Sequence, residues 1–161
     1  SPKFPILGVC VDSCAIRQYY EPGTQVCIDC SPWCTVCSGS TDCTLCDSDA
    51  FYVQSTKKCE YACPAGTFKS YNKVTTNTDC ISCHSSCGSC TGSLATECTS
   101  CKDTTLYVTS LAAIDRFNKG TLAGTIIAEG IDSGSCGLCS SLYGPIGKYC
   151  FPCPANCSSC W

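Results

Sequence analysis

The sequence predicts a small disulfide-rich protein, built as an elongated ladder of cysteine-rich repeats with short β-pairs and little other regular secondary structure. Three observations lead to this fold class. Cysteine accounts for 22 of the 161 residues, well above the level typical of secreted disulfide scaffolds. Nine Cys-x2-Cys pairs recur in register along the chain. Apart from cysteine, apolar side chains are too few for one large core.

The cysteine spacing indicates repeats that begin at Cys27, Cys80 and Cys150. Each of these starts has the pattern Cys-x2-Cys-x3-Cys-x2-Cys, and the first two continue to a further Cys-x2-Cys pair. Both ends of the chain fall inside a repeat, so we expect a segment of a longer array. The expected divisions are 1–26 (the C-terminal part of a preceding repeat), 27–79 (a repeat), 80–149 (a repeat with an insertion at 102–135) and 150–161 (the start of a further repeat).

Regular secondary structure between the cysteines is expected to be short. Gly, Pro, Asn, Asp and Ser separate the cysteines and mark turns, while residues 50–53 and 66–68 have the composition of strands. Each module would contact mainly its neighbours, which predicts a rod. Each disulfide would contribute about 2–4 kcal/mol by restricting the unfolded chain. Because such bonds persist in oxidising compartments, we expect a secreted or cell-surface protein.

Residues 102–135 form a long cysteine-free stretch with substantial apolar content. Leu111, Ile114 and Phe117 have helical spacing, and we expect a short amphipathic helix that ends near Gly120. Residues 125–128 have strand character. Two interpretations remain open: an enlarged loop that packs on its own module, or a docking element for a partner. The candidate partner contacts are Leu111, Ile114, Phe117, Ile126 and Ile127.

Charge and hydropathy argue against nucleic-acid binding and against a membrane-spanning helix. The formal net charge is −3, and the ten Lys and Arg residues are spread along the chain, which is unlike a nucleic-acid-binding protein. No apolar stretch reaches the roughly 18 residues of a membrane-spanning helix. The sequence therefore predicts no nucleic-acid partner and no membrane-spanning segment in this chain.

Segments around the start of the second repeat resemble the furin-like cysteine-rich repeat. They are Cys-Pro-Ala-Gly-Thr-Phe at 63–68 and Cys-Ile-Ser-Cys-His-Ser-Ser-Cys-Gly-Ser-Cys-Thr-Gly at 80–92, followed by Cys-Thr-Ser-Cys at 98–101. This family includes the cysteine-rich regions of growth-factor receptors and proprotein convertases, and similar arrays occur in cysteine-rich surface proteins of protists. The resemblance covers essentially the whole chain, with 102–135 as an insertion. It implies an architecture rather than an activity.

The resemblance also implies a disulfide pairing, which spacing alone leaves open. The ten implied bonds are Cys14–Cys27, Cys30–Cys37, Cys34–Cys43, Cys46–Cys59, Cys63–Cys80, Cys83–Cys90, Cys87–Cys98, Cys101–Cys136, Cys139–Cys150 and Cys153–Cys160. Cys10 and Cys157 are left over. They would bond either with flanking sequence or with adjacent copies in an assembly. The gap lengths depart most from the family pattern at Cys101–Cys136 and Cys139–Cys150.

Other chemistry of Cys-x2-Cys pairs fits the spacing poorly. A zinc site needs two such pairs that fold around one ion, and neighbouring pairs here are only three residues apart. Thiol redox enzymes carry one such motif at a helix start, and iron–sulfur proteins do not need this register in every repeat. We therefore expect no metal and no cofactor.

A catalytic site is also not expected. His84 is the single histidine, and it lies in a tight loop between Cys83 and Cys87. Asp47 and Asp49 are close in sequence, but no second carboxylate pair faces them. The sequence therefore predicts that the chain is not an enzyme.

The remaining features concern the surface. Asn156-Cys157-Ser158 is an N-glycosylation sequon. Trp33 and Trp161 lie beside cysteines and are expected to stack on disulfides, with partner binding as the alternative. The predicted function is an extracellular structural rod, such as a surface coat, stalk or filament subunit, that self-associates or joins neighbouring repeats. The alternative is a ligand-binding receptor ectodomain segment in which the 102–135 loop, Tyr19 and Tyr20 contact a protein ligand.

Overall fold

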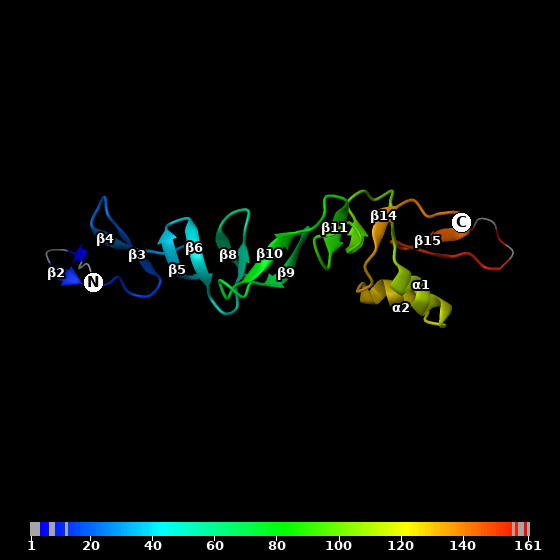
Figure 1. The fold of residues 1–161 in the computed structure, drawn as a ribbon, viewed down its shortest axis with the longest axis horizontal. Coiled ribbons are helices and arrows are strands. Elements are labelled where there is room, and N and C mark those ends of the chain that lie inside the picture. Colours follow the sequence, from blue (N-terminus) through cyan, green and yellow to red (C-terminus); the bar gives the residue numbers. More distant parts are fainter. Residues whose placement is uncertain (1–3, 7–8, 12, 156, 158–159, 161) are drawn as a thin grey trace. The chain divides into compact units, whose positions relative to one another are not determined.

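The computed structural model describes residues 4–6, 9–11, 13–155, 157 and 160. The chain divides into two compact units, and Figure 1 traces them from the blue N-terminus to the red C-terminus. The N-terminal unit comprises Ser1–Pro64 and Lys69–Ile81, and the C-terminal unit comprises Ala65–Phe68 and Ser82–Trp161. This division falls close to residue 80, the expected boundary between the two repeats. The limits of the repeats stay predictions.

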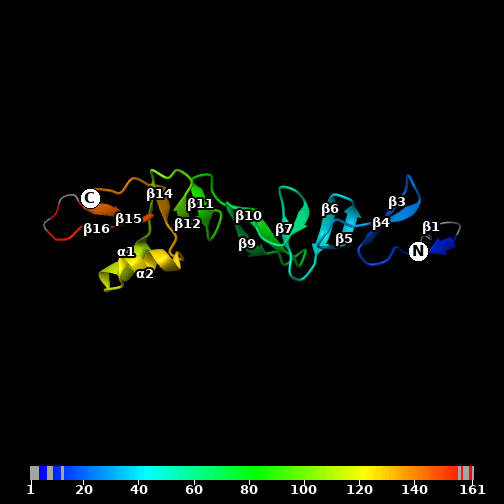
Figure 2. The same cartoon turned by 180° about the vertical axis from the view of Figure 1, so that it is seen from behind.

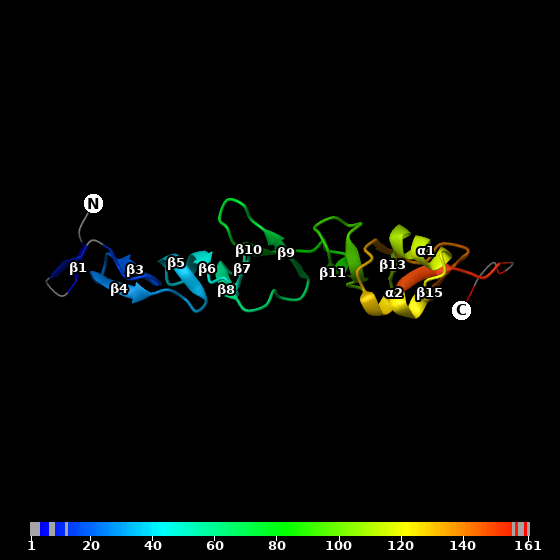
Figure 3. The same cartoon turned by 90° about the horizontal axis from the view of Figure 1, so that it is seen from below.

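Short antiparallel hairpins make up most of the N-terminal unit. Three two-stranded sheets follow one another in sequence: β1 (Phe4–Ile6) with β2 (Val9–Val11), β3 (Gln18–Glu21) with β4 (Val26–Asp29), and β5 (Cys34–Gly39) with β6 (Asp42–Cys46). In Figure 3 the β3–β4 hairpin lies next to β5, which it contacts. A four-stranded sheet then has the order β8 (Lys58–Glu60), β7 (Phe51–Val53), β10 (Thr78–Ser82), β9 (Thr67–Tyr71).

The C-terminal unit combines a hairpin, a mixed sheet and two helices. The hairpin pairs β11 (Cys87–Cys90) with β12 (Cys98–Cys101). The sheet has the order β14 (Ser135–Gly137), β13 (Tyr107–Thr109), β16 (Tyr149–Pro152), β15 (Tyr143–Ile146). The helices are α1 (Leu111–Asn118) and α2 (Ala123–Glu129), and α1 contacts both α2 and β16 (Figure 2). The expected fold class, disulfide-rich with short β-pairs, is confirmed.

The predicted helix in the insertion is confirmed, and Ser110 begins it. The Ser110 side chain accepts a hydrogen bond from the Ala113 N–H at 3.2 Å, which satisfies one of the free amides of the first turn. The strand expected at residues 125–128 is wrong, because these residues belong to α2. Gly130 ends α2 in the left-handed conformation with φ 60°, so this glycine is a helix C-cap and not a strand boundary.

Burial explains why residues 125–128 form a helix despite their β-branched side chains. Ile126 is fully buried and packs in a cluster with Val108, Ala113, Tyr149 and Phe151. A helix places Ile126 on this cluster, and tertiary packing outweighs the weak intrinsic preference of isoleucine for strands. The insertion thus gives the C-terminal unit a conventional apolar core.

The N-terminal unit has a core of a different composition. Its buried cluster consists of Cys34, Cys43, Cys46, Cys59 and Ala50. Cysteine side chains in disulfides therefore form most of this core, whereas aliphatic and aromatic side chains form the buried cluster of the C-terminal unit. The two halves of the chain have nearly equal numbers of apolar residues other than cysteine, 24 in residues 1–80 and 25 in residues 81–161, so the two cores differ in which residues the fold buries.

Candidate functional site

Ten disulfides run through both units. Each of the ten pairs that the resemblance implies has its two sulfur atoms joined in the structure, including the two with the most unusual gaps, Cys101–Cys136 and Cys139–Cys150. Their Cα–Cα distances range from 5.0 Å to 5.8 Å. These distances lie within the ordinary range for disulfides, so the backbone accommodates all ten.

Consecutive bonds follow one another with little free chain between them. For example, two residues separate Cys43 from Cys46, where the Cys46–Cys59 bond begins, and three residues separate Cys59 from Cys63. The same short links recur from Cys14 to Cys160, as the bond positions show. A nearly continuous path of covalent cross-links therefore runs along the described chain.

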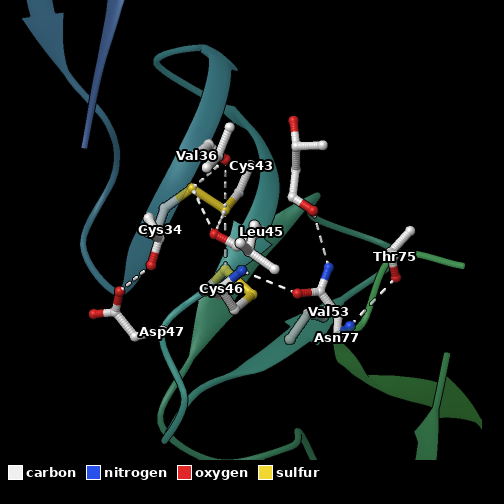
Figure 4. Close-up of a disulfide and its surroundings, with 12 residues drawn as sticks. Cys34, Val36, Cys43, Leu45, Cys46, Asp47, Val53, Thr75 and Asn77 are labelled. Atoms are coloured by element: carbon white, nitrogen blue, oxygen red, sulfur yellow. Dashed lines mark hydrogen bonds between the residues drawn. A yellow bond between two sulfur atoms is a disulfide. The ribbon is translucent and has the colours of Figure 1, made fainter. Parts of the chain in front are cut away.

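Two of these disulfides stack on each other in the N-terminal unit (Figure 4). The Cys59 sulfur lies 3.1 Å from the Cys43 sulfur, which joins the Cys34–Cys43 bond to the Cys46–Cys59 bond. Backbone carbonyl oxygens approach from the strands, with Val36 O 3.1 Å from the Cys34 sulfur. The pair of bonds forms the centre of the buried cysteine cluster.

This stack also produces the sulfur-rich cluster with metal-like spacing in the described part of the chain. One sulfur from each of Cys34, Cys43 and Cys59 lies within 4.8 Å of the others, and all three are buried. Zinc binds cysteine as thiolate, and a sulfur in a disulfide is not one. The cluster is therefore explained by packing of two disulfides.

Asn77 joins this cysteine cluster to a distant loop. Its Oδ1 accepts a hydrogen bond from the Cys46 N–H at 3.0 Å, and its Nδ2 donates to the Thr44 carbonyl at 3.0 Å (Figure 4). The side chain is almost fully buried. Nothing in the sequence pointed to Asn77, because hydrogen bonds across more than thirty residues leave no local signature.

The titratable residues singled out from the sequence do not form a catalytic cluster. His84 is exposed, and its Nδ1 lies 2.8 Å from the Ser86 hydroxyl in the same turn. Asp47 forms an ion pair with Arg17 at 3.0 Å and accepts a hydrogen bond from Thr35 at 2.6 Å. Asp49 is exposed two residues further along. Each of these side chains therefore has a local structural environment.

Most of the candidate partner contacts in the insertion face inward. Ile114 and Ile126 are buried, and Phe117 packs on Phe151 with ring centroids 5.0 Å apart. Ile127 also packs against the core cluster, whereas Leu111 is 82% exposed. The helical spacing indicated an amphipathic face, and the structure places that face against its own module. Leu111 is the member of the set that a partner can reach.

A charged cluster joins the two helical parts of the insertion, and a tyrosine hydrogen bond connects it to the sheet. Arg116 in α1 donates hydrogen bonds to Glu129 and, at 2.6 Å, to Asp132. The bond to Glu129 is the main cause that raises the pKa of Arg116 above its ordinary value. The Tyr149 hydroxyl donates to the Asp132 carbonyl at 2.7 Å, and burial raises the pKa of Tyr149. These contacts link α1, the segment after α2 and β16.

Cys10 and Cys157 are the two cysteines outside the ten bonds. Cys157 is an exposed free thiol. Cys10 lies in β2, and its side chain falls outside the described residues, as does all of Asn156, the predicted glycosylation site, and of Trp161. Within the described part of the chain, no helix is long and apolar enough to cross a membrane.

Known proteins with similar sequences carry arrays of this kind. The chain is 35% identical over 94 residues to proprotein convertase subtilisin/kexin type 5 of Branchiostoma californiense, which covers 58% of this chain and 6% of that protein. It is 38% identical over 86 residues to cysteine repeat modular protein 1 of Tetrahymena thermophila, covering 53% of this chain and 3% of that protein. It is 26% identical over 186 residues to furin-like protease 2 of Drosophila melanogaster, covering 96% and 11%.

The similarity to the proteases falls in their cysteine-rich repeat regions and not in their catalytic domains. The chain spans only about a tenth or less of the length of these relatives. No protein-family model matches the chain, and no solved structure matches it. The resemblance to furin-like cysteine-rich repeats is confirmed, and the chain is an extracellular cysteine-rich module.

Proposed function

We propose that this chain is a non-catalytic structural module, an extracellular rod that serves as part of a surface coat, stalk or filament. The observation that carries the proposal is the near-continuous path of disulfides from Cys14 to Cys160. Covalent links at such short intervals limit how far the backbone can extend under load. They also keep a chain with two small cores folded in dilute, protease-rich surroundings.

The proposed rod requires an elongated form and contacts with like modules. Elongation follows from repeats that each contact mainly their neighbours. The proposed contacts are either self-association or stacking on neighbouring repeats of a longer chain. Cys10 and Cys157 are assigned to bonds with flanking sequence or with adjacent copies, and the exposed Cys157 thiol is available for either. Asn156 is proposed as a glycosylation site next to that thiol.

A second function, a ligand-binding segment of a receptor ectodomain, has one observation in its favour. Leu111 is 82% exposed and lines a hollow of about 210 Å³ with Thr96, Thr109 and Ser135. A protein ligand that inserts a side chain into this hollow would bury the exposed face of Leu111. Tyr19 and Tyr20, the other proposed contacts, are half-buried in β3 and offer less surface.

Self-association of the oxidised chain separates the two functions. The chain is secreted from a eukaryotic host, and its ten bonds are verified by non-reducing mass spectrometry. Sedimentation velocity over a concentration series then measures its mass, and electron microscopy shows its form. Regular polymers, lost in Cys157→Ser if they are covalent, support the structural function. A monodisperse monomer at all concentrations contradicts self-assembly and favours the receptor segment.

A Leu111→Glu variant sharpens the comparison. If the hollow beside Leu111 is a subunit contact, the charge in L111E prevents polymer formation while the disulfide map stays unchanged. Leu122→Glu is the matched control, because Leu122 is also exposed in the insertion but does not line the hollow. Polymers that form equally well in both variants would place the subunit contact elsewhere on the chain.

A further inference from the structure

Trp33 and Tyr61 form an exposed aromatic pair in the N-terminal unit. Their ring centroids are 6.0 Å apart at an interplanar angle of 48°. Trp33 is 47% exposed and Tyr61 is 70% exposed. The chain has only two tryptophans and a scarcity of apolar core residues, yet it leaves this large ring in contact with solvent. The surface formed by Trp33, Tyr61 and their polar neighbours is called the Trp33 surface below.

Trp33 is held in a backbone conformation that bulky residues rarely adopt. Its φ is 64°, in the left-handed region. The conformation is fixed because the Trp33 carbonyl accepts a hydrogen bond from the Asp47 N–H at 2.9 Å and because the next residue, Cys34, is tied to Cys43. Arg17 and Leu142 have similar φ values of 68° and 71° in their own turns, so this conformation belongs to the turns of the fold. At Trp33 the turn presents the indole ring on a rigid support.

Trp33 lines two hollows in the N-terminal unit. One has a volume of about 340 Å³ and is lined by Arg17, Thr35, Asp47 and Asp49 together with Trp33. The other has a volume of about 310 Å³ and is lined by Gln18, Asp29 and Ser31 among others. Each hollow is at the lower end of the size range of small-molecule sites. Each could hold one ring of a small polar ligand.

The polar groups around Trp33 offer both donors and acceptors, with three carboxylates (Asp29, Asp47 and Asp49) and one guanidinium (Arg17). Arg17 and Asp47 neutralise each other in an ion pair of 3.0 Å, and the Arg17 side chain is 58% exposed. Asp49 and Ser48 are exposed beside this pair. The hydroxyl of Ser31, which lines the second hollow, is buried and has no hydrogen-bond partner in the structure. A bound polar ligand could satisfy that hydroxyl.

This combination selects one class of ligand. A basic peptide would meet the exposed charge of Arg17, and an anionic ligand would meet the carboxylates of Asp47 and Asp49. A sugar ring presents C–H groups on one face, which pack on an aromatic ring, and hydroxyls at its rim, which both donate and accept hydrogen bonds. We infer that the Trp33 surface binds a neutral saccharide, with the indole ring as the platform and Arg17, Asp49 and Ser31 as hydrogen-bonding groups.

Ligand binding at Trp33 can be followed by its fluorescence. In a Trp161→Phe variant, Trp33 is the remaining tryptophan. This oxidised variant is titrated with four neutral disaccharides: maltose, cellobiose, lactose and N,N′-diacetylchitobiose. The expected result is a saturable emission shift with at least one of them, with a Kd in the range of about 1 mM that is usual for weak small-ligand sites. Saturation-transfer NMR should show contact through the C–H protons of the sugar.

Variants test whether the binding occurs at the Trp33 surface. Trp33→Asn keeps a residue that tolerates positive φ and removes the platform, so saturation transfer to the sugar should disappear. Asp49→Asn should weaken binding about tenfold by removing a charged hydrogen-bond acceptor. Tyr71→Ala is the matched control, because Tyr71 is an exposed tyrosine of the same unit that lines neither hollow. It should bind as the parent does.

Three results would overturn the inference. One is the absence of binding by all four disaccharides. Another is binding that survives Trp33→Asn in a protein whose ten disulfides are intact. The third is tighter binding of the tripeptide acetyl-Gly-Arg-Gly-amide than of any disaccharide, lost in both Trp33→Asn and Asp49→Asn, which would assign the surface to basic protein segments. Because self-association is measured separately, none of these results bears on the proposed structural role.

Discussion

The side chain of Asn77 accepts the hydrogen bond of the Cys46 N–H at 3.0 Å, although 31 residues separate the two in the chain. The same amide group donates to the Thr44 carbonyl at 3.0 Å. One buried side chain therefore satisfies two backbone groups of β6 beside the stacked disulfides (Figure 4). It holds the loop before β10 against the cysteine core without any covalent bond.

Replacing Asn77 with alanine should destabilise the N-terminal unit locally. The Cys46 N–H and the Thr44 carbonyl would lose their partners, and a buried unpaired polar group costs about 1–3 kcal/mol. Amide hydrogen exchange at Cys46 should accelerate by at least about tenfold, since each 1.4 kcal/mol is a factor of ten. Hydrogen-exchange NMR on the oxidised protein measures this rate residue by residue.

Asn118→Ala is the control for that experiment, because Asn118 is an exposed asparagine at the end of α1. It should leave exchange at Cys46 unchanged. An Asn77→Ala protein with native exchange at Cys46 would mean that the neighbouring disulfides alone protect β6, and that Asn77 contributes nothing to the loop.

Gly134 should be intolerant of any side chain. A Cβ atom at this position would lie 2.1 Å from the Thr109 carbonyl oxygen, and backbone cannot move aside cheaply. Gly134→Ala should therefore lower the free energy of unfolding of the C-terminal unit by about 1–3 kcal/mol, the usual cost of overpacking. Gly124→Ala, where nothing lies within 4 Å of the new Cβ, should be neutral or stabilising because it improves a helix interior. Guanidinium unfolding followed by near-UV circular dichroism measures both, and equal effects would contradict the close approach at Thr109.

The contrast between these residues and the cysteines shows what the sequence could predict. Cysteine spacing is a strong local signal, and the helical spacing of Leu111, Ile114 and Phe117 correctly indicated α1. The same kind of local inspection failed at Ile126, because its burial against Tyr149 and Phe151 decides the conformation of α2. Local patterns therefore identified elements whose structure depends on near neighbours.

The features of the candidate site that the sequence left out depend on distant parts of the chain. Asn77 and Gly134 each contact backbone that lies at least 25 residues away, at Cys46 and Thr109 respectively. Trp33 was noted as a neighbour of cysteines, but its partner ring, Tyr61, lies in another segment. A single sequence contains no signal for such contacts, because the identity of one residue does not reveal which distant residue it meets in the fold.

Arg116 should be important for the attachment of the insertion. Its removal in Arg116→Met leaves Asp132 without its cation, and that carboxylate has a side-chain exposure of only 8%. Because Arg116 itself is 28% exposed, we expect a measurable lowering of the unfolding temperature that is smaller than the loss typical of fully buried pairs. Lys119→Met removes an exposed ion pair with Asp115 in the same helix and should cost under about 0.5 kcal/mol. Thermal unfolding compares the two variants, and a similar loss in both would contradict a special role for Arg116.

The buried Tyr149 side chain should cause the folded protein to lose stability at alkaline pH. Burial raises the pKa of Tyr149 in the folded state, so the folded protein retains a proton that the unfolded chain releases near the ordinary tyrosine pKa of about 10. The contribution of the protonated Tyr149 side chain to the free energy of unfolding is fully present below the ordinary tyrosine pKa. It is lost as the pH rises through the folded-state pKa of Tyr149. Tyr149→Phe should be less stable at neutral pH by about 1 kcal/mol, through loss of the hydrogen bond to the Asp132 carbonyl, and should show a shallower alkaline decline. Parallel pH slopes for both proteins would show that other groups cause the decline.

The disulfides should differ in their resistance to reduction according to burial. Cys34 and Cys43 are 1% and 6% exposed, whereas Cys153 and Cys160 are half-buried. A reductant must reach a sulfur atom to attack it, so brief treatment at low concentration should open Cys153–Cys160 before Cys34–Cys43. Alkylation followed by peptide mass spectrometry gives the order. In the monomeric fraction, where Cys157 has formed no bond, its exposed thiol should be labelled before any reductant is added. Repeating the treatment in guanidinium exposes every bond, so the difference should disappear there. If Cys34 and Cys43 were labelled first in the folded protein, the stacked disulfides would not form the protected centre of the N-terminal unit.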